Sequence, residues 1–246
     1  MLGIKKDEFK KIFLHDLKNK LFTIKLNLDL IKTGKIDREK EKEILEKLSL
    51  TSDEIFEALQ DYFELEKFKS LKLIKYEKID LGEYVETVVN ELEIFAQRLN
   101  VKIFYVKPKE PFYINASKEW LKKALTNIIH NSIKYNRQNG RVFINLHKEK
   151  NGYLIIIKDT GIGISEDKKK NIFEEFYSSN KTGSGIGLNT AKAIIESHSG
   201  IISFESTENK GSNFYIYLPK ISKKLQLRLF FLVILLILAI FQFLHF

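Results

Sequence analysis

Hydrophobic positions in the first 70 residues follow a helical period. They recur at gaps of three and four, which predicts a helix over residues 5–33 with one buried stripe, at Phe9, Phe13, Leu17, Leu21, Ile24, Leu28 and Ile31. A second run with similar spacing extends from Ile44 to Tyr62. Between the runs, residues 33–37 contain a Gly stop signal and an Asp that can cap the next helix, so we expect an antiparallel hairpin. Because two helices bury little apolar surface, pairing of two copies into a four-helix bundle is expected.

The pattern changes near residue 71, where short runs of Ile, Phe, Tyr and Val alternate with helical segments. Helices are predicted over residues 81–99 and 118–136, and strands over 101–106, 141–148, 153–159, 201–206 and 213–219. This alternation predicts an α/β sandwich. The expected domains are residues 1–70, a hairpin, and residues 71–220, the sandwich.

The C-terminal segment, residues 221–246, has a different pattern. Residues 229–246 carry no charge and would extend over roughly 27 Å as a helix, enough to cross a bilayer. Lys220, Lys223, Lys224 and Arg228 precede them and no Lys or Arg follows, which predicts a tail anchor with residues 1–228 in the cytoplasm. The expected fold class is therefore α+β: a dimeric hairpin, an α/β sandwich and a C-terminal transmembrane helix.

Composition narrows the chemistry. Because the chain has no Cys, disulfide scaffolds and thiolate metal sites are excluded. The 41 basic and 32 acidic residues give a net charge of +9, which suits nucleic acid, an anionic membrane or a polyphosphate ligand without choosing among them.

His15 is the first candidate for chemistry. It is offset from the apolar stripe by roughly 170° at 100° per residue, so it should face solvent. Asp16 follows it, and Asn19 lies one turn further on the same face. An imidazole is an available nucleophile near neutral pH, and the neighbouring carboxylate and amide can assist it. The three residues alone are also compatible with an ordinary solvated helix face.

Two glycine-rich turns and a polar ladder form the second group of candidates. Asp159 ends a strand and is followed by Gly161 and Gly163, and residues 183–188 (GSGIGL) open a helix. Such turns bring backbone N–H groups close to phosphates. A Rossmann fingerprint is excluded because GSGIGL follows a polar loop rather than a strand. The polar ladder lies on the helix over 118–136 and consists of Asn127, Asn131, Lys134 and Tyr135. Its carboxamides suit Mg²⁺ and phosphate oxygens, and its lysine supplies a positive charge.

Together these motifs resemble the bacterial two-component sensor histidine kinases over about residues 5–220. HDLKN is similar to the phosphoacceptor box, NIIHNSIKY to the N-box, DTGIGI and TGSGIGL to the two glycine boxes, and FEEFY to the F-box. The resemblance implies a Bergerat-type domain that binds ATP and Mg²⁺, and a homodimeric bundle whose phosphorylated His passes its phosphoryl group to a response regulator. With the predicted tail anchor, the expected location is the inner (cytoplasmic) membrane, with the kinase domains in the cytoplasm, and no nucleic-acid partner is expected.

The resemblance also implies roles for individual residues. His15 would accept the phosphoryl group, Asp16 would act as its acid–base partner, and Asn19 would serve dephosphorylation of the regulator. Asn131 would bind Mg²⁺, and Asp159 would accept a hydrogen bond from adenine. Residues near the phosphates would be Asn127, Lys134 and Tyr135; Gly161 and Gly163 would make room for the ring; and the lid would comprise Lys181, Thr182, Gly183, Ser184, Gly185, Ile186, Gly187 and Leu188.

Two alternatives and one departure remain. An anti-sigma-type Ser/Thr kinase shares the nucleotide boxes but lacks a His-bearing hairpin, and a degenerate membrane-tethered scaffold would be inactive. Related ATPases place a Glu one turn before the metal Asn, where this chain has Asn127, so transfer to a protein nucleophile is favoured over ATP hydrolysis. Lys20 stands where many relatives have Pro, so a helix bend there is not expected.

Overall fold

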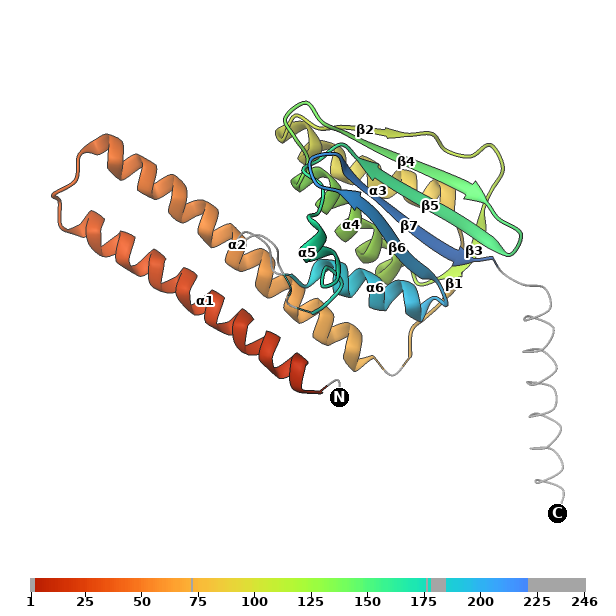
Figure 1. The fold of residues 1–246 in the computed structure, drawn as a ribbon, viewed down its shortest axis with the longest axis horizontal. Coiled ribbons are helices and arrows are strands. Elements are labelled where there is room, and N and C mark those ends of the chain that lie inside the picture. The colour runs from red at the N-terminus through yellow and green to blue at the C-terminus, as the bar shows by residue number, and fades with distance from the viewer. Residues whose placement is uncertain (1–2, 72, 176, 178–184, 221–246) are drawn as a thin grey trace, which may run out of the picture.

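The computed structural model describes residues 3–71, 73–175, 177 and 185–220. A long helical hairpin extends from an α/β sandwich, with the C-terminal half of its second helix against the sandwich (Figure 1).

The hairpin consists of α1 (Gly3–Lys32) and α2 (Arg38–Ser70). The turn between them confirms the predicted break: Gly34 adopts a φ of 64°, and Asp37 caps α2 by accepting a hydrogen bond from the Lys40 amide at 2.8 Å. Helix α1 continues through Lys20, as expected without a proline. Part of the apolar stripes meets in a small core formed by Phe13, Leu17, Ile55, Ala58 and Leu65, whereas Leu21 and Leu28, predicted in the buried stripe of α1, are 56% and 42% exposed.

The sandwich contains two sheets and three main helices. A five-stranded sheet has the order β2 (Lys102–Tyr105), β4 (Arg141–Lys148), β5 (Gly152–Asp159), β7 (Gly211–Pro219), β6 (Ile201–Thr207). Only the β2–β4 pair is parallel. A small antiparallel pair joins β1 (Glu77–Asp80) to β3 (Tyr113–Ala116). The helices are α3 (Leu81–Arg98), α4 (Lys118–Lys134), the short α5 (Glu166–Lys169) and α6 (Gly187–Ser197).

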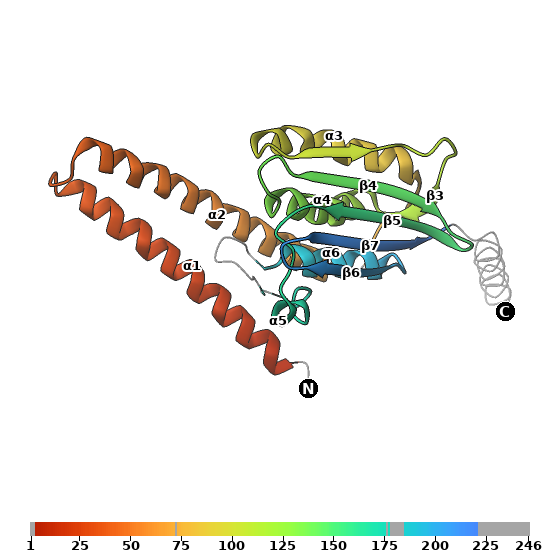
Figure 2. The same cartoon turned by 45° about the horizontal axis from the view of Figure 1, so that its top comes forward.

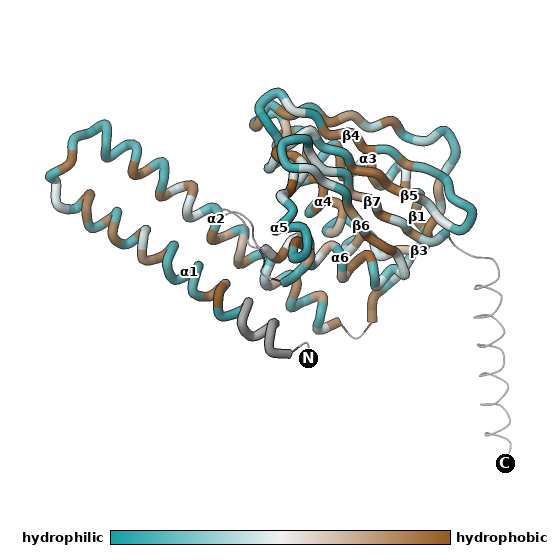
Figure 3. The backbone as a smooth tube through the Cα atoms, viewed as in Figure 1, coloured by the Kyte–Doolittle hydropathy of each residue, from teal (hydrophilic) through white to brown (hydrophobic). Residues whose placement is uncertain are grey.

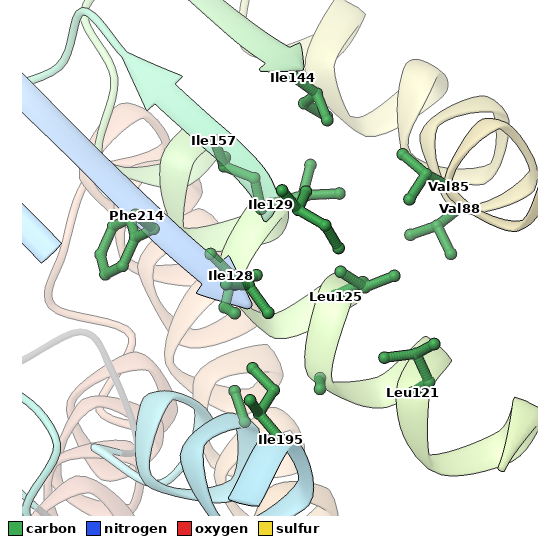
Figure 4. Packing of buried hydrophobic residues seen from close by; sticks show 14 of the residues in the cluster. Val85, Val88, Leu121, Leu125, Ile128, Ile129, Ile144, Ile157, Ile195 and Phe214 are labelled. Carbon is green, nitrogen blue, oxygen red and sulfur yellow. The ribbon is translucent and has the colours of Figure 1, made fainter. Parts of the chain in front are cut away.

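Helices α3, α4 and α6 cover one face of the large sheet and form the main core with it (Figure 2). Ile144, Ile157 and Phe214 point from the strands toward Leu125 and Ile128 on α4 (Figure 4). Alternate strand residues are buried, which accounts for the β-period of the sequence. This packing fixes α4, whose other side carries the polar ladder.

The five strands and two helices predicted for the sandwich are present, but the β1–β3 pair was not predicted. The fold class needs one correction, concerning the C-terminal transmembrane helix. No helix in the described ranges is long and apolar enough to cross a membrane. The two longest, α1 and α2, carry charges along their length, which are costly in hydrocarbon. Residues 229–246, where that helix was predicted, lie outside the described residues, so the fold class is corrected to an α+β chain in which no described helix spans a membrane.

Candidate active site

A cavity of about 300 Å³ lies between α4, the end of β5, the start of α6 and the flank of α2. Helix α4 lines it with Asn127, Asn131, Lys134 and Tyr135. These residues recur at three- and four-residue spacing, so they form one helical face, while Leu121, Leu125 and Ile128 are buried in the core. The predicted ladder therefore borders a space suited to a small ligand.

Asp159 is buried where β5 meets the first glycine turn, and its side chain borders the cavity. One carboxylate oxygen, Oδ1, accepts hydrogen bonds from the backbone amides of Gly161 at 2.8 Å and Ser212 at 3.1 Å. Burial raises the pKa of Asp159, and these two amides oppose that rise. Both amides bond to the same oxygen, and no hydrogen bond to Oδ2 is found among the described residues, so this oxygen can accept from a donor in the cavity.

The first glycine turn, which follows Asp159, is held in place by backbone contacts. A Cβ on Gly161 would collide with the Tyr135 carbonyl oxygen, and one on Gly163, whose φ is +66°, would collide with the Thr207 carbonyl oxygen. The Ile162 amide also donates to the Tyr135 carbonyl at 3.1 Å. Gly161 therefore lets the turn lie against the end of α4, and Gly163 lets it lie against the end of β6, which together set the position of Asp159 relative to the ladder.

The described residues of the second glycine box, 185–188, lie in two different environments. Gly185, Gly187 and Leu188 line the cavity, and Asn127 donates from Nδ2 to the Gly187 carbonyl at 2.9 Å. Ile186 is instead fully buried in the hairpin core. The other members of the predicted lid, Lys181, Thr182, Gly183 and Ser184, lie outside the described residues.

Asn131 fits the chemistry of a Mg²⁺ ligand. Its carboxamide lines the cavity and forms no side-chain hydrogen bond within the described residues. Over the same residues, no group of three or more His, Cys, Asp or Glu side chains could hold a metal. One amide oxygen without a protein cage suits Mg²⁺, which usually keeps waters and binds substrate phosphates.

The face of α1 that carries His15 agrees with the sequence pattern. His15 is exposed, and Asn19 lies one turn away with Nδ2 at 3.1 Å from the His15 Nδ1. Among the described residues, the other ring nitrogen, Nε2, has no hydrogen-bond partner. Asp16 is half-buried and lies 3.8 Å from the Lys20 ammonium.

The contribution of α2 to the cavity was not predicted. Glu54, Glu57 and Asp61 line it, and Glu57 accepts a hydrogen bond from the Lys134 ammonium at 3.2 Å. Lys123, one turn before Asn127, donates to Asp61 at 3.2 Å and also pairs with Glu64. Burial lowers the pKa of Lys123, but these carboxylates outweigh burial and raise it overall. Lys123 could have been found from its spacing to Asn127, whereas no local signal marks Glu57.

Comparison with known proteins decides the family. Residues 116–222 match the family model described as "Histidine kinase-, DNA gyrase B-, and HSP90-like ATPase". The chain is 30% identical over 213 residues to the heme sensor protein HssS of Staphylococcus saprophyticus, and 27% identical over 225 residues to the sensor histidine kinase WalK of Bacillus subtilis. These alignments cover 85% and 86% of this chain. The chain carries a histidine-kinase-type ATPase domain, and the relatives it resembles over most of its length include sensor histidine kinases.

One solved structure shows that the hairpin and the sandwich share the fold of a histidine kinase. The histidine kinase ThkA in complex with the response regulator TrrA matches 87% of this chain and 61% of that chain, with a TM-score of 0.73 and 21% identity. This chain spans 45% of HssS and 36% of WalK, so it corresponds to part of the length of these sensor kinases. The residues matched by the ATPase family model include those of α4, β5 and α6 that line the cavity, but not those of α2.

Proposed function

We propose that this chain is an ATP-dependent protein-histidine kinase that phosphorylates its own His15 and passes the phosphoryl group to an aspartate of a response regulator. One observation carries the proposal. The cavity that holds Asp159 and the α4 ladder is also lined by α2, the helix paired with the one that bears His15. The nucleotide site and the candidate acceptor thus belong to parts of one chain that are in contact.

In this proposal, each part of the cavity binds a different part of the nucleotide. The Oδ2 atom of Asp159 accepts a hydrogen bond from the adenine amino group, while Lys134 and Tyr135 lie near the phosphates. Asn131 offers its amide oxygen to Mg²⁺, which when bound neutralises charge on the phosphates. Asn127 holds the start of α6 through the Gly187 carbonyl, which supports a role in shaping the phosphate end of the site.

The transfer step uses Nε2 of His15, the ring nitrogen that has no hydrogen-bond partner among the described residues. His15 attacks the γ-phosphorus of ATP through Nε2, the bond to the ADP oxygen breaks, and the ring loses its Nδ1 proton. A lone pair on Nε2 requires the ring proton to be on Nδ1. When the Asn19 carboxamide is turned so that its Oδ1 faces the ring, Asn19 accepts a hydrogen bond from this Nδ1–H. The carboxylate of Asp16, next to His15 in the sequence, accepts the released proton. Because Asn19 is exposed beside His15, it is also placed to orient a water that removes the phosphoryl group from the regulator.

We also propose that the working unit is a homodimer. Large apolar side chains remain exposed along the hairpin, at Leu14, Leu21, Leu28, Leu45, Phe56 and Phe63. Leu14, Leu21 and Leu28 are seven residues apart, as are Phe56 and Phe63, so each set forms a stripe along its helix. A second hairpin is the economical cover for both stripes, because a symmetric pair buries the same surface twice.

Two rival activities fit the site less well. ATP hydrolysis by relatives of this fold needs a general base where this chain has Asn127, and a carboxamide cannot abstract a proton. A Ser/Thr kinase of the anti-sigma type needs no His-bearing hairpin, yet this chain presents His15 with an amide partner.

Labelling of the full chain with Mg-ATP tests the proposal. We expect a phosphoryl label that is lost in acid and kept in base, because protonation of a phosphoimidazole releases its phosphoryl group. His15→Gln should abolish the label and leave nucleotide binding unchanged, whereas His147→Gln, at an exposed position on β4, should change neither. An acid-stable label, or full labelling of His15→Gln, would contradict the proposal.

A further inference from the structure

Lys20 connects the two helices of the hairpin beside the proposed phosphoacceptor. Its ammonium donates to the Glu54 carboxylate on α2 at 2.9 Å and lies 3.8 Å from the Asp16 carboxylate, one turn earlier on α1. The Lys20 side chain is only 15% exposed, whereas those of Asp16 and Glu54 are 48% and 27% exposed. A lysine this well covered is held by its two carboxylates, because burial without them would cost free energy.

The two partners of Lys20 connect the proposed phosphoacceptor to the nucleotide cavity. Asp16 is adjacent in sequence to His15, and Glu54 lines the nucleotide cavity. Three side chains, Asp16, Lys20 and Glu54, therefore form a continuous charged row between the acceptor and the rim of the cavity.

The row also fixes where Asp16 points. Neighbouring residues of a helix do not face each other, so Asp16 gains no orientation from His15 itself. The ammonium of Lys20 draws the Asp16 carboxylate toward α2 and the cavity, the side from which ATP would approach.

We infer that Lys20 is a positioning residue for phosphoryl transfer: through its bridge to Glu54 it holds the Asp16 carboxylate on the side of His15 that faces the nucleotide cavity. The inference rests on the proposed kinase function. A purely structural bridge between α1 and α2 would contribute to the stability of the hairpin but not to the rate at a fixed population of folded protein.

Rate and binding measurements on four variants of the full chain separate these roles. Lys20→Met retains most of the stem but removes the charge, Lys20→Arg keeps the charge, and Glu54→Gln removes the anchor. Lys25→Met is the matched control, because Lys25 is an exposed lysine of the same helix that lies outside the phosphoacceptor box. For each variant we would measure the single-turnover rate of His15 labelling at saturating Mg-ATP, the ATP dissociation constant and the melting temperature.

We expect Lys20→Met to slow labelling by about tenfold or more with an ATP dissociation constant within about twofold of wild type, because a misplaced group affects the transition state more than binding. Glu54→Gln should be slowed in the same direction, Lys20→Arg should recover most of the rate, and Lys25→Met should match wild type. Labelling of Lys20→Met at the wild-type rate while folded would overturn the role of Lys20 alone. A Lys20→Arg variant that is folded but as slow as Lys20→Met would also overturn it. If wild type itself gives no label on His15, the proposed function and this role both fail.

Discussion

The hairpin and the sandwich bury their hydrophobic residues to different extents. In the sandwich, residues from α3, α4, α6 and the strands form one core, and many of its largest side chains are fully buried. In the hairpin, Phe56 and Phe63 are 62% and 65% exposed, and brown positions recur along α1 and α2 in Figure 3. The sandwich therefore has a large core of its own, whereas the hairpin buries few apolar side chains and exposes many along its two helices.

The difference is clearest on α2, which has three distinct faces. One face packs on α1 through Ile55 and Leu65. A second face carries the acids that pair with Lys20, Lys134 and Lys123. Phe56 and Phe63 lie roughly 140° from the acidic face at 100° per residue, so a second copy could cover them without displacing the sandwich. One helix can thus serve the dimer, the hairpin core and the nucleotide cavity.

The largest expected effect of a single change in the sandwich is on nucleotide binding. Asp159→Asn should weaken ATP binding by about 1–3 kcal/mol, or about 5- to 150-fold, because the adenine amino group would lose its acceptor or meet another donor. Calorimetric titration with a non-hydrolysable ATP analogue measures this. Asp167→Asn, at an exposed acid, is the control. Unchanged affinity in Asp159→Asn would show that the adenine assignment is wrong.

The same substitution should leave the fold at least as stable at neutral pH. Burial raises the folded pKa of Asp159 above its unfolded value, so its contribution to stability is present below the unfolded pKa and lost as pH rises through the folded pKa. Asparagine removes that cost and can still accept from the Gly161 and Ser212 amides. Denaturation curves from pH 4 to pH 8 would show a smaller loss of stability with rising pH than in wild type.

The next largest effect concerns the hairpin. Phe56→Glu should weaken self-association by about 2 kcal/mol or more, about 30-fold, because a charge would replace an aromatic side chain at the expected interface. Sedimentation equilibrium measures it, and Val106→Glu, 82% exposed in the sandwich, is the matched control. A monomeric wild type, or equal dissociation constants for both variants, would rule out this face as the dimer interface.

The smallest expected effect concerns an ion pair between the hairpin and the sandwich. Glu57 holds Lys134, which the proposal assigns to the phosphates, so Glu57→Gln should tighten ATP binding by about two- to fivefold, the scale of a half-exposed ion pair. Glu119→Gln provides the comparison, because Glu119 pairs with Lys67 and does not line the cavity. Equal or weaker affinity in Glu57→Gln would show that the pair does not compete with the nucleotide.

The sequence predicted what depends on local pattern. Apolar periodicity located the hairpin and the strands, and the angular offset of His15 correctly placed it in solvent. The β1–β3 pair was missed because neither strand contains a run of three β-branched or aromatic residues, as the equally short β2 does. Helix α2 extends to Ser70 through tertiary contacts such as the packing of Phe68 on Trp120 at 5.0 Å. The Glu57–Lys134 pair joins residues 77 positions apart, so no local pattern could reveal it.

The two glycines after Asp159 show a related limit. Their presence pointed correctly to a tight turn, and the resemblance gave room for a ring as the reason. The structure adds another reason, since a Cβ on Gly161 or Gly163 would meet the carbonyl oxygen of Tyr135 or Thr207, while Gly163 also lines the cavity. Sequence identified the residue type that the turn requires, whereas the cause depended on which backbone segments meet there.

Mapping the phosphoryl group after incubation of the full chain with Mg-ATP tests the central claim most directly. Mass spectrometry under alkaline conditions, with ³¹P NMR to assign the nitrogen, should find one phosphoryl group per chain at most, on Nε2 of His15. A phosphoryl group on Ser or Thr, or conversion of ATP to ADP and free phosphate with no phosphorylated intermediate on the chain, would contradict the account.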